Sequence, residues 1–512
     1  MSDVKDNIRE YERRVKLMAA KGSASCDYPL PDYLGDVKKI LKYSAEVVPT
    51  DKYLGTKDAS FLYQICFKVV YLDSEDVLTE ARFSADFEHS ERLERECIDA
   101  SADAKAESVS IRLQGPRKIC AKAQMTTEVY IIEALPLPTL VYNDTIEKDL
   151  CYANIYSVEY LECAEREFAE RIAALADISC EDAEVIKEGA AAYVESVVSE
   201  GGGICVKGYV VGTALIRSED GVIRAEKKIP FEENLSTDRI LEGNASYHAK
   251  AFVTDAKITL NNEMGEDGLG DGCYCSVVLS YSVKCLIRIN KNCEYELVKD
   301  AFAPGKLNSG EYVEFTYDEL IAEVNEKRKS ACEIERPTGP IREIIECEAE
   351  LKGLRVAAQG EEITVSADVC YSGIVSLADG SGFAPVKHTA KAEERMKLPA
   401  LAGDCRIECS AIPSEVSMSF DNERLYFSTV ISVNAVALKE HKDKIMTGLV
   451  TEDGKAESTP TVTVYYPTVG DTVWSVAKSH AVSPSALMRL NTFTFGKNDE
   501  RIDNLKYVLI AN

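Results

Sequence analysis

Long runs in which apolar and polar residues alternate with a period of two constrain the fold of this chain more than any other feature. In one run, polar residues separate the apolar positions Cys273, Cys275, Val277, Leu279, Tyr281, Val283 and Cys285. A second run has Leu425, Phe427, Thr429, Ile431 and Val433. Such alternation is typical of half-buried antiparallel strands. The sequence therefore predicts a mainly β fold, with helical periodicity only in connections such as 165–176 and 317–329.

Two sets of markers indicate an internal repeat with a period of roughly 145–160 residues. The segments Asp36–Ala45, Asp182–Ala191 and Pro340–Ala349 align with one another. Polar breaks follow at similar distances in each copy, and their composition predicts hairpin turns. These breaks are Ser74-Glu75-Asp76, Ser218-Glu219-Asp220 and Ala378-Asp379-Gly380.

The markers predict three β-rich, sandwich-like repeat domains with helical connectors, arranged like beads on a string. Their expected ranges are 1–140, 141–297 and 298–440. Residues 441–462 are charged and then rich in Thr, Ser and Pro, which indicates a flexible linker. Residues 463–512 would form a separate C-terminal domain.

The C-terminal segment has the pattern of a small β-α-α-β domain. A strand at Val464–Tyr466 leads through a Gly470-Asp471 turn into a helix with Val473, Trp474, Val476 and Ala477 as apolar positions. Ser483 stands at an N-cap position, with Pro484 at the first helical position of a second helix. A closing strand is expected at 507–510. Trp474 either packs between the helices or faces a ligand groove.

The charge and the cysteine content limit the classes of partner and compartment. A formal charge of −27 and a pI near 4.8 argue against nucleic acid or anionic lipid as the main partner. The seventeen cysteines are odd in number and form no CxxC pair, so we expect reduced thiols in the cytosol. The first sixteen residues are highly charged and lack an apolar signal core, and no apolar run is long enough to insert into a membrane.

No catalytic or metal-binding constellation stands out in the sequence. The five histidines are scattered and lack metal-ligand spacing, and no nucleophile signature occurs. Gly201-Gly202-Gly203 is interpreted as a hairpin turn rather than a phosphate loop. Residues 261–272 are interpreted as a hairpin loop rather than a calcium loop. We therefore expect no enzyme activity, no cofactor and no metal.

Two resemblances then suggest a function. The run from Gly470 through Trp474 to Lys478 resembles the LysM domain. Together with repeats that contain Leu30–Leu41 and Gln114–Ile119, the whole chain resembles the SPOCS-domain spore-coat morphogenetic proteins of clostridia. This resemblance implies a non-catalytic adaptor in the mother-cell cytosol at the forespore surface. Its LysM-like tail would bind stage IV sporulation protein A, the ATPase of the coat's basement layer, alongside other coat proteins.

The resemblance also implies a binding groove in the tail, with one wall formed by Gly470, Asp471 and Thr472. LysM modules usually bind N-acetylglucosamine polymers, so a peptidoglycan-binding protein is the alternative function, and an enzyme with a targeting tail is a third. The second wall begins at Asn491 and carries Phe493 and Phe495 beside mixed charges. Aromatic anchors with a polar rim favour protein docking. Both rings could instead pack onto the tail helices.

Overall fold

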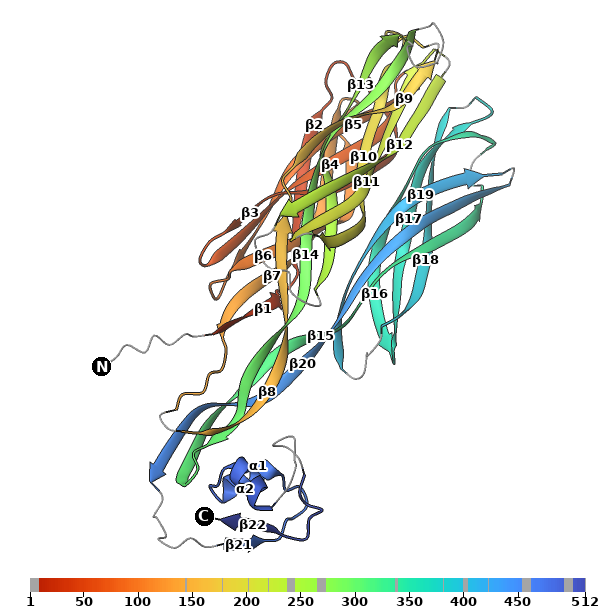
Figure 1. Ribbon diagram of the computed structural model, residues 1–512. Coiled ribbons are helices and arrows are strands. Elements are labelled where there is room, and N and C mark those ends of the chain that lie inside the picture. The colour runs from red at the N-terminus through yellow and green to blue at the C-terminus, as the bar shows by residue number, and fades with distance from the viewer. Residues whose placement is uncertain are drawn as a thin grey trace.

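The structure is a computed structural model that describes most of the chain. The described residues are 9–142, 145–176, 178–200, 202–219, 221–236, 245–264, 273–336, 339–380, 382–398, 404–421, 423–453, 462–491 and 501–511. They form an elongated body of antiparallel sheets with a small helical tail at one end (Figure 1). The prediction of a mainly β fold is therefore confirmed.

The first 128 described residues, 9–136, form what we call unit 1. Its strands are β1 (Glu10–Lys16), β2 (Ala20–Pro29), β3 (Val37–Leu54), β4 (Asp58–Asp73), β5 (Leu78–Arg92), β6 (Asp99–Leu113) and β7 (Lys118–Pro136). Strand β7 pairs with β1, β2 and β6 in a four-stranded sheet. The three middle strands form a second sheet in the order β3-β4-β5.

Unit 2 (residues 147–302) has the same order of strands. They are β8 (Glu147–Glu162), β9 (Arg166–Ala176), β10 (Glu184–Glu200), β11 (Gly203–Ser218), β12 (Gly221–Ser236), β13 (Ser246–Met264) and β14 (Cys273–Phe302). Strand β14 pairs with β8, β9 and β13, and the middle strands form the sheet β10-β11-β12.

Unit 3 (residues 306–453) follows the same plan, with one long strand in place of the first two. Its strands are β15 (Lys306–Glu335), β16 (Ile341–Gln359), β17 (Glu362–Leu377), β18 (Phe383–Lys397), β19 (Cys405–Phe420) and β20 (Arg424–Asp453). They form the sheets β15-β20-β19 and β16-β17-β18. In each unit the main apolar core lies between the central strands of the two sheets, as with Ile65 of β4 and Met125 of β7.

The three units, which together we call the body, share a central apolar cluster. Three of its residues, one from each unit, stand at β-bulges: Leu41 of β3, Ile186 of β10 and Ile345 of β16. The cluster also receives Val70, Leu215 and Ile374 from the neighbouring strands. A bulge turns a side chain out of the regular alternation, so each unit can direct one apolar residue to its neighbours. The expected beads-on-a-string arrangement is therefore wrong.

The two connectors expected to be helical are strands. Residues 166–176 form β9, which pairs with β14, and residues 317–329 lie within β15, which pairs with β20 along its length. Both segments are rich in residues that favour helices, such as Ala, Glu and Leu. Pairing with a long partner strand overrides this weak local preference.

The predicted linker is also shorter than expected. Residues 441–453 continue β20 and pair with the first part of β15, so they are not a linker. Likewise, β14 continues past residue 297 to Phe302. The predicted boundaries stop too early because the strands extend as far as their partners do. Residues 454–461 lie outside the described part of the chain.

Most of the predicted turns are found. Residues 74–76 connect β4 to β5, and residues 378–380 connect β17 to β18. Gly202 stands between β10 and β11 with a φ of 85°, a conformation that favours glycine. Of the acidic, glycine-rich segment 261–272, the first four residues belong to β13 and the others are outside the described residues.

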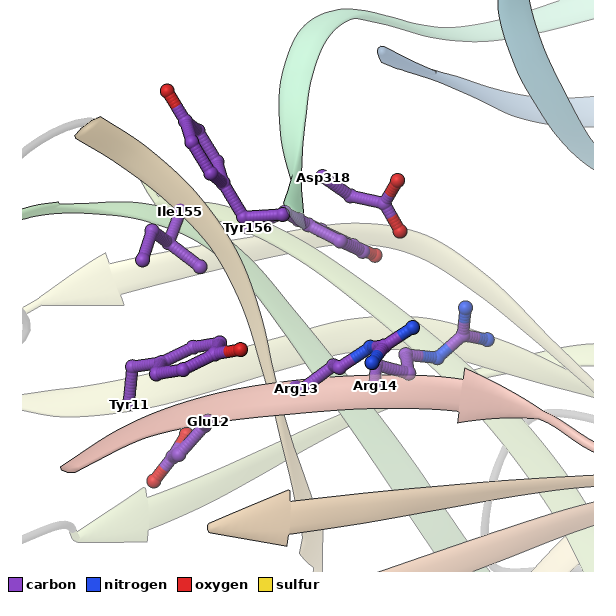
Figure 2. Close-up of a pocket in the computed structure, with 8 residues that line it drawn as sticks. Tyr11, Glu12, Arg13, Arg14, Ile155, Tyr156 and Asp318 are labelled. Carbon is purple, nitrogen blue, oxygen red and sulfur yellow. The ribbon is translucent and has the colours of Figure 1, made fainter. Parts of the chain in front are cut away.

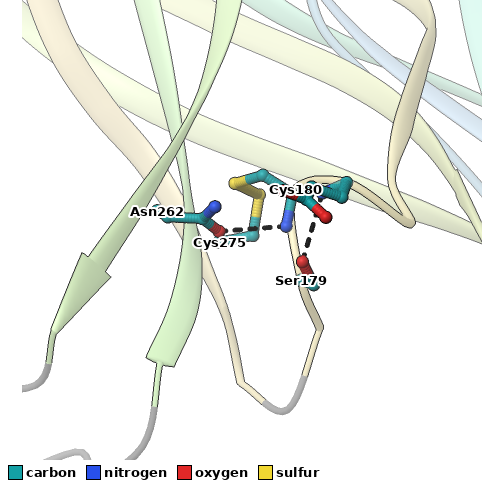
Figure 3. Close-up of a disulfide and its surroundings, with 5 residues drawn as sticks. Ser179, Cys180, Asn262 and Cys275 are labelled. Atoms are coloured by element: carbon teal, nitrogen blue, oxygen red, sulfur yellow. Dashed lines mark hydrogen bonds between the residues drawn. A yellow bond between two sulfur atoms is a disulfide. The ribbon is translucent and has the colours of Figure 1, made fainter.

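One disulfide links two distant parts of unit 2 (Figure 3). Cys180, in the connection between β9 and β10, is bonded to Cys275 of β14, with a Cα–Cα distance of 5.1 Å. The Cys180 amide also donates to Asn262 Oδ1 at 3.1 Å. The expectation that every cysteine is reduced is wrong for this pair. Their separation of 95 residues gives no motif from which pairing could be predicted.

Candidate functional site

The C-terminal tail (residues 462–511) contains the only two helices among the described residues. Its elements are β21 (Val462–Tyr465), α1 (Val473–Ser479), α2 (Pro484–Asn491) and β22 (Val508–Ala511), and β21 pairs antiparallel with β22. Neither helix is long enough to cross a membrane. The order of elements is the one predicted from the sequence.

The helix caps account for where the helices begin. Thr472 caps α1, and its side chain accepts from the Ser475 amide while Ser475 Oγ accepts from the Thr472 amide. In α2, Ser483 Oγ accepts from the Ala486 amide at 3.1 Å, and Pro484 occupies the first helical position. Both starts agree with the capping preferences of Ser, Thr and Pro.

The turn at 470–472, predicted as one wall of the groove, is built around the Asp471 carboxylate. Asp471 Oδ2 accepts from Tyr465 Oη at 2.8 Å and from the Thr468 amide at 2.7 Å. Partial burial raises the pKa of Asp471, but the hydrogen bonds from Thr468 and Tyr465 outweigh it, so the pKa lies below its usual range. Gly470 has a φ of 96°. The carboxylate therefore connects the end of β21 to the start of α1.

The turn is also joined to the segment that begins at residue 501. The Gly470 amide donates to Asp503 Oδ2 at 3.1 Å, and Thr472 forms an isolated antiparallel bridge with Arg501. The structure thus brings the predicted first wall next to residues 501–503. Phe493 and Phe495 lie outside the described residues.

Asn491, the other predicted site residue, connects α2 to β22. Its Nδ2 donates to the carbonyls of Leu487 and Leu509 at 2.8 and 2.7 Å, and its Oδ1 accepts from the Leu509 amide at 2.6 Å. These three bonds use both the donor and the acceptor ends of the amide. Asn491 therefore has an architectural role in this structure.

We expect Asn491→Ala to lower the stability of the tail by about 1–3 kcal/mol, because backbone groups of Leu509 lose their partner. Thermal unfolding followed by the fluorescence of Trp474 measures this effect. Arg489→Ala, at an exposed position of the same helix, is the control and should change stability by less than about 0.5 kcal/mol. Equal effects of the two substitutions would contradict the role assigned to Asn491.

The structure reveals a contact that the sequence did not indicate, between the tail and the place where β14 leads through residues 303–305 into β15, which we call the β14–β15 corner. Trp474 Nε1 donates to Asp300 Oδ2 at 2.8 Å, and Lys478 Nζ lies 2.6 and 2.7 Å from the two Asp300 oxygens. Tyr312 Oη donates to Asp300 Oδ1 at 2.8 Å. One carboxylate of the body therefore accepts from two side chains of the tail.

Apolar packing accompanies these polar bonds. Phe302 belongs to the same buried cluster as Val473, Trp474 and Val476. The rings of Phe302 and Trp474 meet edge to face, with centroids 5.1 Å apart, which is a favourable aromatic geometry. The Gly305 amide donates to the Ala481 carbonyl at 2.7 Å. Trp474 is 7% exposed, so the interpretation of this residue as core is confirmed, but the core includes a residue of the body.

The charges at this junction stabilise one another. Burial raises the pKa of Asp300, but hydrogen bonds from Lys478, Trp474 and Tyr312 outweigh burial and leave the pKa below its usual range. Burial lowers the pKa of Lys478, but its bond to Asp300 raises the pKa above its usual value. Both groups are therefore ionised at neutral pH. The expectation of a tail joined to the body only through a flexible linker is wrong, because the tail packs against the β14–β15 corner.

A second junction lies where the units meet, at strands β1, β8 and β15. A small pocket there is lined by Tyr11, Glu12, Arg13, Arg14, Ile155, Tyr156, Tyr317 and Asp318 (Figure 2). Arg14 bonds to Glu408 at 2.6 Å and to Tyr160 Oη at 3.0 Å, and its guanidinium lies over the Tyr130 ring. Its charge is thus satisfied by residues of all three units. The pocket therefore lies at the interface between the three units.

The described residues contain no group of three His, Cys, Asp or Glu side chains arranged to hold a metal ion. Comparisons with protein-family models, with curated proteins and with solved structures gave no match. The function must therefore be inferred from the residues and their geometry.

Proposed function

We propose that this chain is a non-catalytic scaffold in spore-coat morphogenesis. In this proposal, units 1–3 are SPOCS-like repeats and residues 462–511 are a LysM-like domain that recruits a partner protein. The observation that carries the proposal is the junction at Asp300. A carboxylate that binds both Trp474 and Lys478 holds the tail in a defined orientation on the body. The same contact couples the tail to the body in the free protein, which suits an adaptor whose body and tail bind different proteins.

The surface of the tail supports a protein partner. Val462, Val464 and Tyr466 are 61%, 48% and 67% exposed, and exposed apolar groups in succession are typical of protein-binding surfaces. The tail segment 462–512 also has five basic and four acidic residues, whereas the whole chain carries −27. The tail therefore repels an acidic partner less than the chain as a whole does.

We propose a coat-morphogenetic ATPase like stage IV sporulation protein A as the main partner, with other coat proteins, in the mother-cell cytosol at the forespore surface. This assignment depends on the resemblance of residues 470–478 and of the repeats. The main alternative, binding of N-acetylglucosamine polymers through the groove, is less favoured, since Asp471 and Asn491 are occupied by bonds within the tail.

A pulldown from sporulating cells tests this proposal, with the intact chain and a chain ending at Asp453 as baits. The truncation keeps all of β20, which an earlier end would cut. We expect the intact chain to recover the ATPase and the truncated chain to lose it. Micromolar binding of N-acetylglucosamine oligomers in calorimetry, without recovery of the ATPase, would favour the glycan function instead.

A further inference from the structure

The surface of α1 that contacts the body has the composition of a binding site. It combines the indole of Trp474, the ammonium of Lys478 and the carbonyl of Ala481. The body covers it with a carboxylate, a phenyl ring and a backbone amide, from Asp300, Phe302 and Gly305. An aromatic anchor next to a partly buried charge is characteristic of the energetic centre of protein interfaces.

We propose that this α1 face is the surface with which the tail binds its protein partner, and that the β14–β15 corner occupies it in the free protein. The partner displaces the corner by presenting the same chemistry, a carboxylate next to an aromatic ring. This inference rests on the proposed function. It specifies which surface of the tail binds the partner and which chemical groups that surface recognises.

The groups of the body that now cover the α1 face, Asp300 and Phe302, indicate the chemistry of the partner. Lys478 places both oxygens of a carboxylate within 2.7 Å of its Nζ, and the Trp474 N–H adds a second donor to the same group. A carboxylate satisfies both donors, whereas a neutral or basic group would leave the Lys478 charge without a partner. The edge-to-face contact of Phe302 with Trp474 shows that this surface also accommodates an aromatic ring next to the carboxylate.

Displacement is feasible because the tail has a core of its own. Val476, Leu487, Val508 and Ile510 are at most 3% exposed and all belong to the tail. The described contacts with the body come mainly from the β14–β15 corner. The tail can therefore leave the corner and remain folded while it stays covalently attached to the body. The partner can bind only those molecules in which the α1 face is open. Its apparent affinity for the chain is therefore its intrinsic affinity multiplied by the fraction of open molecules.

Trp474 reports on this equilibrium because it is the only tryptophan of the chain. In the full chain, Asp300→Ala and Lys478→Gln should each shift its emission to longer wavelength and at least double its quenching by acrylamide. Small-angle scattering should show a larger radius of gyration for both variants. Asp76→Asn, at an exposed carboxylate paired with Lys38 at 2.6 Å, is the control and should change neither quantity.

A synthetic peptide covering residues 298–312 tests the recognition directly. Added to the Asp300→Ala chain, it should restore the short-wavelength emission, and a peptide in which the aspartate is replaced by alanine should not. An unchanged radius of gyration in both variants would overturn the inference, as would equal activity of the two peptides.

Partner binding provides the second test, with the purified ATPase as the probe. Asp300→Ala should strengthen binding about tenfold, the equivalent of about 1.4 kcal/mol, because the contact with the competing β14–β15 corner is weakened. Lys478→Gln should weaken binding, since the partner needs the same ammonium. Binding unchanged in both variants would exclude the α1 face and leave the proposed function standing. If neither the original chain nor any variant bound the ATPase, the proposed function would be contradicted. The peptide experiment alone would then show whether the α1 face is a docking surface.

Discussion

Replacing Glu346 with alanine should lower the free energy of unfolding of the body by about 3–5 kcal/mol, the typical cost of removing one member of a buried ion pair. Glu346, in β16 of unit 3, lies 2.9 Å from Lys42 Nζ of unit 1 and also contacts Lys187 Nζ of unit 2. The three side chains are 10%, 3% and 11% exposed. The substitution would leave both buried ammonium groups with fewer partners.

The position of these residues explains why the effect should be large. Lys42, Lys187 and Glu346 directly follow Leu41, Ile186 and Ile345, the three bulge residues of the central cluster. Burial lowers the pKa of Lys187, but the carboxylates of Glu348, Glu346 and Glu80 outweigh it and raise the pKa above its usual value. Lys187 therefore remains charged in the folded protein, and the substitution removes one of the three carboxylates that stabilise this buried charge.

Urea unfolding measures the effect, and Glu350→Ala is the matched control. Glu350 lies on the same strand, is 58% exposed and pairs with Lys352 at 3.2 Å. An exposed pair of this kind contributes little, so the control should lose less than about 0.5 kcal/mol. A loss below about 1 kcal/mol for Glu346→Ala would mean that the three units do not share a buried charge network.

The sequence predicted the strands and turns well because these depend on local pattern. Alternation at 273–285 corresponds to β14, and the polar breaks at 74–76 and 378–380 are turns. The common cluster around Leu41 was not predicted. Alternation shows which residues share a face of a strand, but not which faces of distant strands meet. The helical interpretation of 165–176 failed because strand pairing is also a long-range property.

The same limit applies to the candidate site. The turn at 470–472 and the caps of both helices follow from neighbouring residues, and the sequence indicates them. Asp300 is separated from Trp474 by 174 positions and from Lys478 by 178. An acidic residue is unremarkable in a chain with 86 Asp and Glu residues. Only the packing of the tail on the β14–β15 corner distinguishes this carboxylate from the others.

Loss of the Cys180–Cys275 disulfide should lower the free energy of unfolding by about 2–4 kcal/mol, the usual range for a crosslink that closes a long loop. The two cysteines are separated by 95 positions. The bond fixes the connection between β9 and β10 to the central strand of the larger sheet. Cys180→Ser should reproduce the effect of a reducing agent, and adding the reducing agent to this variant should cause no further loss. Cys26→Ser, at a free cysteine of unit 1, is the control.

Alkylation under denaturing, non-reducing conditions should leave two of the seventeen cysteines of the purified protein unlabelled. Labelling of all seventeen would contradict the disulfide. The same measurement on protein taken directly from cells bears on the compartment. A reducing cytosol keeps thiols reduced, so the protein there would fold without this crosslink and have the lower stability. Formation of the disulfide would then add about 2–4 kcal/mol.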